Sequence, residues 1–197
     1  SRKHNCFDSI RGALEQHGNQ APLGTDTLIA TTMCDYIEKE LKAEDINLLL
    51  FPVGLSTEHK EFGGSITFKP MTYYHMLYDI CVSLAQHGFK KIVLLVCHGG
   101  NAPVANLISR GVISDFKVYP FVLNSGIFDH PAVKATFSKG NTYDFHSGEM
   151  ETSMVMAIDE SLVKLETSEK GIPKNTAMKA HLSWLASDWV TEQQKPF

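Results

Sequence analysis

The sequence predicts a three-layer α/β/α fold with a mostly parallel central sheet. Short, wholly apolar runs are typical of strands buried on both faces, and segments with apolar residues at helical spacing separate these runs. Strands of this kind need helices on each side of the sheet. The chain also lacks a linker, a charge block or an internal repeat, so we expect a single domain over residues 1–197.

The first half of the chain predicts two strands and one helix. Residues 5–13 are a weak candidate for a strand, because Asp8 and Arg11 interrupt them. Residues 25–42 carry apolar side chains at helical spacing. Residues 46–53 are a run of Ile, Leu, Phe and Val, which favours a buried strand.

The second half repeats this alternation. Residues 70–87 predict a helix that starts with proline and stops before glycine, and residues 91–97 predict a fully apolar strand. A helix over 101–111, a strand over 117–123 and a helix over 148–162 complete the pattern.

Charge and hydropathy exclude two classes of partner. Lys and Arg number 18 against 22 Asp and Glu, so a net charge of −4 gives no attraction to nucleic acid or to an anionic membrane. The longest apolar runs are far shorter than the roughly 18 residues of a membrane span, and the first residues lack the apolar core of a signal peptide. The four cysteines form no CxxC pair, so we expect a soluble, cytoplasmic protein with reduced thiols.

Histidines and carboxylates gather in the segments that follow the predicted strands or precede the last predicted helix. Ligands of parallel sheets bind at the carboxyl ends of the strands. A mixture of imidazoles and carboxylates suits Zn²⁺, Mn²⁺ or Fe²⁺, and one carboxylate can bridge two ions. The residues concerned are Glu15, His17, Asp26, His98, His146, Glu149 and Glu151.

Each of these residues also has a structural interpretation. Asp26 could cap a helix, and Glu149 and Glu151 could serve only the helix dipole. His98 could end a strand at a tight glycine turn. Cys97 and His98 could form a nucleophile–base pair, although neighbouring residues on a strand point to opposite faces.

Four motifs resemble, in order and approximate spacing, those of the creatininase (creatinine amidohydrolase) family. They are Glu15-Gln16-His17-Gly18, Leu23-Gly24-Thr25-Asp26, His98-Gly99-Gly100-Asn101 and the segment from His146 to Ser153. The loop over 54–68, which contains Glu58 and His59, also resembles that family. The resemblance implies a creatininase-like α/β/α fold and a site with two metal ions that hydrolyses a non-peptide C–N bond, often of a cyclic amide or a formamide.

The resemblance also implies which residues bind the two divalent ions, Zn²⁺, Mn²⁺ or Fe²⁺. One ion would take Glu15, Asp26 and His98, and the other would take His17, Asp26 and Glu149, with Asp26 as the bridge. A hydroxide between the ions would attack the substrate carbon.

Two further residues receive roles from the same resemblance, and His59 receives one from its place in the loop after the strand over 46–53. His146 would carry the proton to the leaving nitrogen, and Glu151 would orient His146 or the water. His59 would line the pocket and contact substrate, or would only hydrogen-bond its loop. The family also suggests a homo-oligomer, often a hexamer.

The chain departs from the family pattern in several places. Creatininase itself supplies a metal ligand two residues after the histidine of the third motif, where this chain has Gly100, so Glu149 is taken as the substitute. Asn19-Gln20 replace a second histidine after the first motif, and Val96-Cys97 replace Asn-Gly before His98. The chain stops at Phe197, short of a last strand and helix that we expect.

The sequence therefore predicts a metal-dependent amidohydrolase of the creatininase type that acts on a small-molecule amide. A formamide deformylase or a peptide-modifying hydrolase would use the same site. A non-catalytic binding subunit with the same fold is a rival of another class. A nucleotide-binding α/β protein is a third, but Gly99-Gly100 lie in neither a GxGxxG nor a P-loop pattern.

Overall fold

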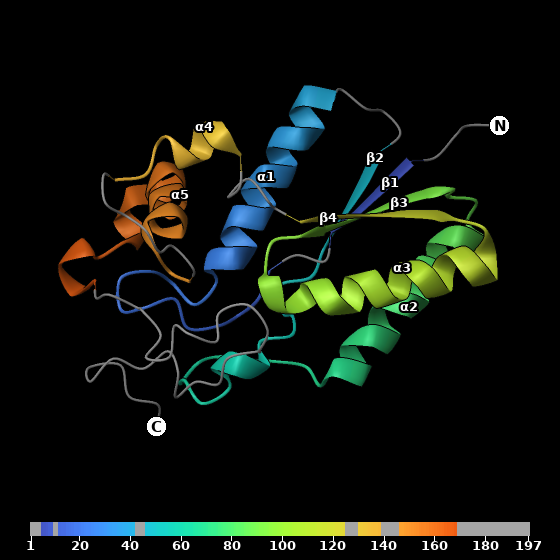
Figure 1. Cartoon of the computed structure of the whole chain (residues 1–197), viewed down its shortest axis with the longest axis horizontal. Helices are drawn as coiled ribbons and strands as arrows, with labels where there is room; N and C mark the ends of the chain where they lie inside the picture. The colour runs from blue at the N-terminus through green and yellow to red at the C-terminus, as the bar shows by residue number, and fades with distance from the viewer. Residues whose placement is uncertain (1–4, 10–11, 42–45, 125–129, 139–145, 169–197) are drawn as a thin grey trace.

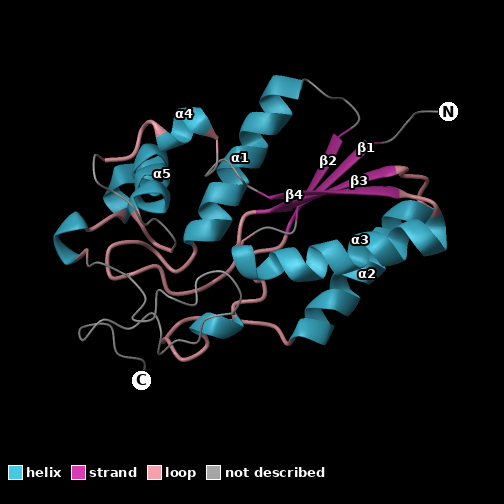
Figure 2. Ribbon diagram, viewed as in Figure 1, coloured by secondary structure: helices cyan, strands magenta, loops and turns pink. Residues whose placement is uncertain are grey.

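The computed structural model of the chain describes residues 5–9, 12–41, 46–124, 130–138 and 146–168. Its sheet has four strands, all parallel, in the spatial order β2-β1-β3-β4. Figure 2 shows the strands fanning out side by side. Their bounds are β1 (Asn5–Ser9), β2 (Ile46–Leu50), β3 (Lys91–Val96) and β4 (Tyr119–Asn124).

Helices lie on both sides of this sheet, which confirms the predicted three-layer fold (Figure 1). One side carries α1 (Thr25–Leu41), against which α5 (Glu149–Asp159) packs, and the other carries α2 (Pro70–Gln86) and α3 (Ala102–Phe116). A short helix, α4 (Pro131–Lys134), precedes α5. None of the helices in the described part of the chain is both long and apolar enough to cross a bilayer.

The main core lies between the sheet and the α2–α3 pair. Side chains that are 0% exposed meet there from both helices and from β3, because wholly apolar strands bury both faces. Examples are Tyr73, Leu77, Ile92, Leu94 and Ile108.

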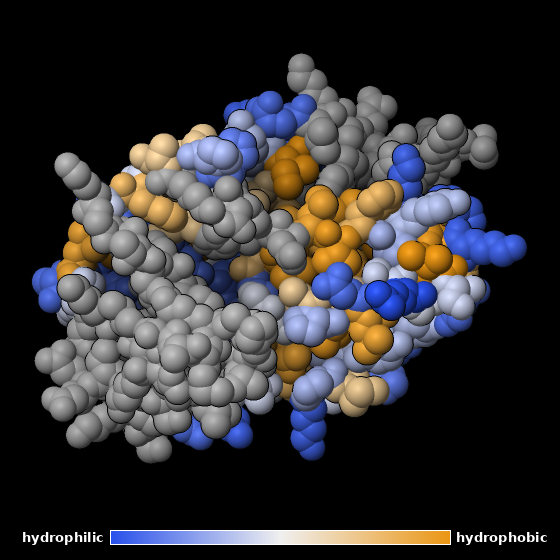
Figure 3. Space-filling model, viewed as in Figure 1, coloured by the Kyte–Doolittle hydropathy of each residue, from blue (hydrophilic) through white to orange (hydrophobic). Residues whose placement is uncertain are grey.

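Some apolar side chains of β4 and α3 lie outside this core. Phe121 and Leu123 of β4 are exposed, as are Leu107 and Ile113 of α3. Figure 3 shows apolar side chains at the surface in this region.

Helix α3 is longer than the predicted helix over 101–111. Glycine weakens a helix, but Val112 continues the buried apolar spacing beyond Gly111, so packing overrides propensity. A Cβ at Gly111 would lie 3.4 Å from the Tyr78 ring, and the glycine therefore lets α2 and α3 approach closely. The helix ends at Phe116 because Lys117 adopts a left-handed φ of 53°.

Other predicted boundaries shift by a few residues. The strand predicted over 5–13 is β1, which ends at Ser9, and the strand predicted over 46–53 ends at Leu50. The helix predicted over 148–162 is divided at Asp159, whose side chain accepts a hydrogen bond from the Ser161 N–H and starts a separate 3₁₀ turn. Helix α4 was not predicted.

Candidate metal centre

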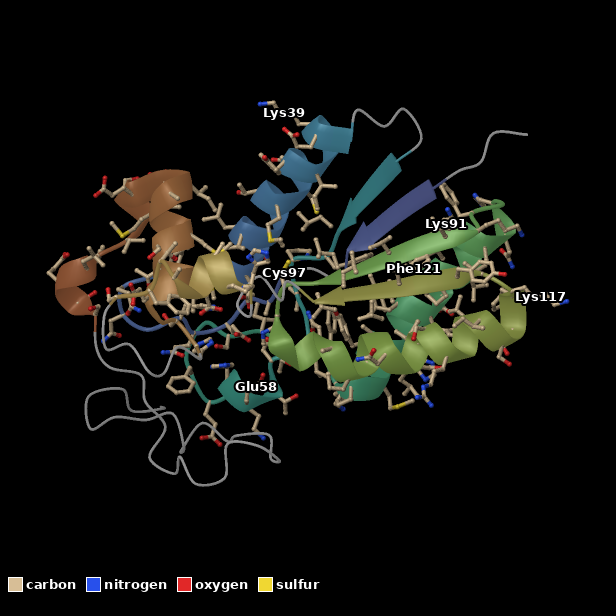
Figure 4. The ribbon with its side chains drawn as sticks, turned by 45° about the horizontal axis from the view of Figure 1, so that its top comes forward. Lys39, Glu58, Lys91, Cys97, Lys117 and Phe121 are labelled. Carbon is tan, nitrogen blue, oxygen red and sulfur yellow. The ribbon has the colours of Figure 1, made fainter. Side chains whose placement is uncertain are left out.

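The candidate site lies where the sheet strands end and the loops begin. Figure 4 shows Cys97 at the carboxyl end of β3, with Glu58 on the 3₁₀ turn Thr57–His59 below it. Segments after β1, β2 and β3 meet the starts of α1 and α5 here. They bring together Glu15, His17, Asp26, Glu58, His59, His98, His146 and Glu151.

The loop after β1 folds back on itself and so places two carboxylates side by side. The Glu15 N–H donates to the carbonyl oxygen of Leu23 at 3.0 Å. The Thr25 N–H and hydroxyl both donate to the Pro22 carbonyl, at 3.1 and 2.7 Å. The folded loop brings Asp26, in the first turn of α1, close to Glu15.

The first group consists of Glu15, Asp26 and His98, all buried. His98 Nδ1 lies 3.3 Å from Glu15 Oε1 and 3.3 Å from Asp26 Oδ2. His98 Nε2 is 2.9 Å from the Leu55 carbonyl oxygen, which can only accept, so Nε2 carries a proton. In the neutral ring, Nδ1 is then the atom that offers a lone pair to a metal ion.

The second group centres on His17, which is 1% exposed. Its Nδ1 donates to the Glu15 carbonyl oxygen at 3.2 Å, and its Nε2 faces two carboxylates. Asp26 Oδ1 lies 3.4 Å from this Nε2, and Glu151 Oε2 lies 3.8 Å from it. Asp26 therefore directs one oxygen at His98 and the other at His17, the arrangement that a bridging ligand needs.

Glu149 lies elsewhere. Its Oε1 accepts hydrogen bonds of 2.7 Å from both the N–H and the hydroxyl of Ser138. No group of potential metal ligands in the described residues includes Glu149, whereas Glu151 forms one with His17 and His146. Residues two positions apart on an α-helix point about 200° away from each other, so only one of Glu149 and Glu151 can face the site.

His146 lies over both groups. Its Nε2 donates to the Gln16 carbonyl oxygen at 2.6 Å, and its Nδ1 lies 3.8 Å from Glu15 Oε1. Burial, followed by the charges of His17 and His59, lowers the pKa of His146 to about 3. The ring is therefore uncharged at neutral pH in the metal-free protein, with Nδ1 as a proton acceptor.

His59 belongs to the same cluster. It is 1% exposed, its Nε2 lies 3.6 Å from Glu15 Oε1, and its ring centroid is 4.3 Å from that of His146. Burial lowers the pKa of His59 to about 4. With Glu15 and His146 it forms a third set of potential metal ligands.

Opposite charges hold the metal-free site together. Burial opposes ionisation of Glu15, yet the charge of His98 lowers the pKa of this carboxyl to about 2. Burial likewise opposes charge on His17, yet Asp26 raises the pKa of that imidazole to about 10. Burial raises the pKa of Glu151 to about 7.

Buried atoms without hydrogen bonds test whether this donor set fits a metal. Both carboxylate oxygens of Glu15, Oδ2 of Asp26 and Nε2 of His17 have no hydrogen-bond partner in the described part of the chain. Buried polar atoms are rarely left this way, because desolvation costs free energy. Divalent cations would satisfy these atoms at once, and the donor set is one that first-row metals prefer.

Two residues in this region received no role from the sequence. Glu58 Oε1 lies 3.6 Å from His98 Nε2, on the side of the ring that faces away from Asp26. Gln20 is 4% exposed and hydrogen-bonds to Ser147, between His146 and the start of α5. The adjacency of Glu58 and His59 was visible in the sequence, but the contact of Gln20 with a residue 127 positions away was not.

Comparison with known proteins decides the family. The family model for creatininase, creatinine amidohydrolase, matches residues 11–196. The chain belongs to the creatininase family. The resemblance seen in the sequence motifs is thereby confirmed.

Characterised relatives of this creatininase-family chain differ in what they act on. A creatinine amidohydrolase from Pseudomonas putida is 28% identical over 176 residues, which cover 79% of this chain and 65% of the relative. A mycofactocin precursor peptide peptidase from Mycobacterium tuberculosis is 29% identical over 168 residues, which cover 81% of this chain and 61% of the relative. The chain thus spans less than two thirds of the length of either.

Solved creatininase structures share the fold. A mutant creatininase of a Zn–Zn type has a TM-score of 0.71 and a creatininase described as Mn has 0.72. Each is 25% identical, and the alignment covers 88% of this chain and 72% of the other.

Proposed function

We propose that this protein is a metal-dependent amidohydrolase that cleaves a C–N bond of a cyclic amide or amide-like small molecule. One observation carries the proposal: buried carboxylate and imidazole atoms converge without hydrogen bonds, while their histidines are oriented by backbone carbonyls. His17, His98 and His146 each place one ring nitrogen against such a carbonyl and turn the other toward the carboxylates. Metal-binding histidines have this arrangement in general.

Two divalent ions fit the two groups. Glu15, Asp26 and His98 would hold one, and His17, Asp26 and Glu151 would hold the other, with Asp26 shared. Glu151 takes the place expected for Glu149, because its carboxylate is the one beside His17. Zn²⁺, Mn²⁺ and Fe²⁺ all suit this set.

The protein's own groups would position the reactants and move one proton. Divalent ions held by these ligands would lower the pKa of a bound water toward neutrality and would polarise a carbonyl oxygen. His146 Nδ1, which lies 3.8 Å from Glu15 Oε1, would accept the proton that the attacking water releases and pass it to the leaving nitrogen. The Gln16 carbonyl fixes the other ring nitrogen, so that Nδ1 stays turned toward Glu15. His59, beside His146, would contact the substrate.

A peptide substrate is the second candidate. The relative from Mycobacterium tuberculosis is a peptide peptidase, and it is 29% identical to this chain, against 28% for the creatinine amidohydrolase. A formamide would suit the same chemistry. We further propose a cytoplasmic homo-oligomer, which light scattering after size-exclusion chromatography would test.

Elemental analysis of the purified protein tests the proposal first. We expect about two equivalents of a first-row divalent metal per chain, either as purified or after loading with Zn²⁺ or Mn²⁺. A Glu15→Ala/His98→Ala double variant should lose most of this metal. A parent protein that takes up no metal under any of these conditions would leave a fold used for binding alone.

Turnover of the loaded protein then separates the substrate classes. Creatinine and other cyclic amides, small formamides and short peptides would be assayed in parallel by release of amine or ammonia. The double variant is the control for background hydrolysis. Cleavage of peptides alone would replace the small-molecule proposal with the peptide one.

A further inference from the structure

The residue before helix α5 has an unusual backbone conformation. Ser147 has a φ of 50°, in the left-handed region that side chains other than glycine seldom adopt. It separates His146 from Gly148, the residue before the first turn of α5. Its N–H donates to a carboxylate oxygen of Glu151 in a short hydrogen bond. The conformation of Ser147 therefore sets the direction of two candidate site residues at once.

Gln20, in the loop after β1, hydrogen-bonds to this turn. Its Nε2 donates to the Ser147 carbonyl oxygen at 2.8 Å and to the Ser147 hydroxyl oxygen at 2.9 Å. Since a carbonyl can only accept, the amide must present its nitrogen here. The side chain is 4% exposed, and its Oε1 has no hydrogen-bond partner among the described residues. Such a buried side chain is ordered by the bonds that it donates.

The backbone around Gln20 is held as well. The Gln20 carbonyl accepts a 2.9 Å hydrogen bond from the Lys164 N–H, and the Asn19 carbonyl accepts one of 2.9 Å from the Thr167 hydroxyl. A Cβ at Gly18 would lie 2.1 Å from Gln20 Oε1, so the glycine leaves room for the amide to fold back. The segment that follows α5 in the chain thus fixes the position of Gln20 relative to His17 through these two hydrogen bonds.

We infer that Gln20 is a positioning residue: by holding Ser147 in its left-handed conformation, it sets His146 and Glu151 against the ligands of the loop after β1. Within the described part of the chain, the other group that holds the Ser147 turn is the carboxylate of Glu151. Relaxation would move the Glu151 carboxylate away from His17 Nε2. It would leave the group of Glu15, Asp26 and His98 intact, because His98 Nδ1 is held by the carboxylates of Glu15 and Asp26 themselves.

Gln20→Leu tests this inference because leucine has a similar volume and no donor. Gln86→Leu is the matched control, since Gln86 is exposed at the end of α2. The inference rests on the proposed metal site, so two readouts are needed. They are the affinity for Zn²⁺ of the purified chain and the side-chain histidine NMR spectrum of the metal-free chain.

We expect Gln20→Leu to bind its second equivalent of Zn²⁺ at least tenfold more weakly, as changes beside metal ligands typically do. The first equivalent and the Gln86→Leu control should match the parent. In the metal-free spectrum, the His146 signals should move while those of His98 stay in place. Ser147→Gly in the Gln20→Leu background should recover part of the affinity, because glycine adopts a positive φ without strain.

Unchanged affinity for both equivalents together with an unmoved His146 signal would overturn the role of Gln20 alone. A parent that binds no Zn²⁺ would overturn the proposed function, and the metal-free spectrum would still decide the role of Gln20. If Gln20→Leu does not fold, Gln20→Glu replaces it, because glutamate keeps the shape and turns the donor into an acceptor.

Discussion

Glu149 and Glu151 are chemically identical and two positions apart, yet only one carboxylate faces the candidate site. We expect Glu151→Gln to lose one of two bound metal equivalents, because an amide is a far weaker ligand than a carboxylate. Glu149→Gln is the matched control, and it should keep both. Metal content after dialysis measures the difference. The opposite result would restore Glu149 as the ligand and exclude the arrangement described here.

His146 has two possible roles that one substitution separates. Its Nδ1 lies near Glu15, but the ring also belongs to a potential metal group with His17 and Glu151. If it carries the proton, His146→Gln should keep both metal equivalents and lower kcat by about 10²- to 10⁴-fold, with a smaller change in KM. Loss of an equivalent on metal analysis of the same variant would make His146 a ligand.

At the scale of elements, a buried asparagine joins the ends of three strands. Asn101 is 0% exposed, its Oδ1 accepts from the Leu55 N–H at 2.8 Å, and its Nδ2 donates to the Gly12 carbonyl at 3.2 Å. A Cβ at Gly54 would lie 2.6 Å from Asn101 Oδ1, so these segments are in close contact. The side chain thus links the loops after β1 and β2 to the one after β3.

Asn101→Ala should therefore cost about 2 to 4 kcal/mol of unfolding free energy, because it leaves the partly buried Leu55 N–H and the buried Gly12 carbonyl without this partner. Asn106→Ala is the control, since Asn106 is exposed on α3 and hydrogen-bonds within its own helix. Urea unfolding followed by circular dichroism measures both. A cost for Asn101→Ala no larger than that of the control would show that the loops are held by other contacts.

The sequence predicted the strands and helices that apolar patterning encodes. It missed helix ends and side-chain orientations that depend on contacts between distant residues. Strands β2 and β3 were visible because their residues are mostly apolar, whereas the end of α3 depended on packing beyond Gly111. The loops that carry Glu15 and His98 were identified from their histidines and carboxylates. The orientation of Glu151 could not be, because it depends on how α5 packs against α1.

Gly100 illustrates the same limit. In the sequence it was a missing ligand, with no reason attached. In the structure, a Cβ at this position would lie 2.2 Å from the Leu55 carbonyl oxygen and 2.5 Å from His98 Nε2. Any side chain there would disturb the hydrogen bond that orients His98. In the proposed metal site a ligand would then come from another element, and α5 places the Glu151 carboxylate beside His17.

At the scale of the whole molecule, the site couples global stability to pH. Asp26 raises the pKa of His17 from 6.5 to about 10, despite burial, so the folded metal-free chain retains a proton that the unfolded chain loses. This contribution to stability is fully present below about pH 6.5 and is lost as the pH rises through 10. Glu151, with a pKa of about 7, acts in the same direction between pH 4.5 and 7. His59 and His146 have lowered pKa values and act in the opposite direction, below pH 6.5.

We therefore expect the unfolding free energy of the metal-free protein to fall between pH 7 and 10, by up to about 1.4 kcal/mol per pH unit for each retained proton. Urea unfolding in the presence of a chelator measures this slope. With saturating Zn²⁺ the slope should become shallower, because the metal takes the place of the protons and binds more tightly as its ligands lose them. The gap between loaded and metal-free stability should accordingly widen with pH. His98, which faces Glu15 and Asp26, also has a pKa raised well above its usual value, so two imidazoles retain protons in this range. His17→Gln removes one of them and should make the metal-free slope shallower without abolishing it. An unchanged slope in this variant would show that His17 does not retain its proton.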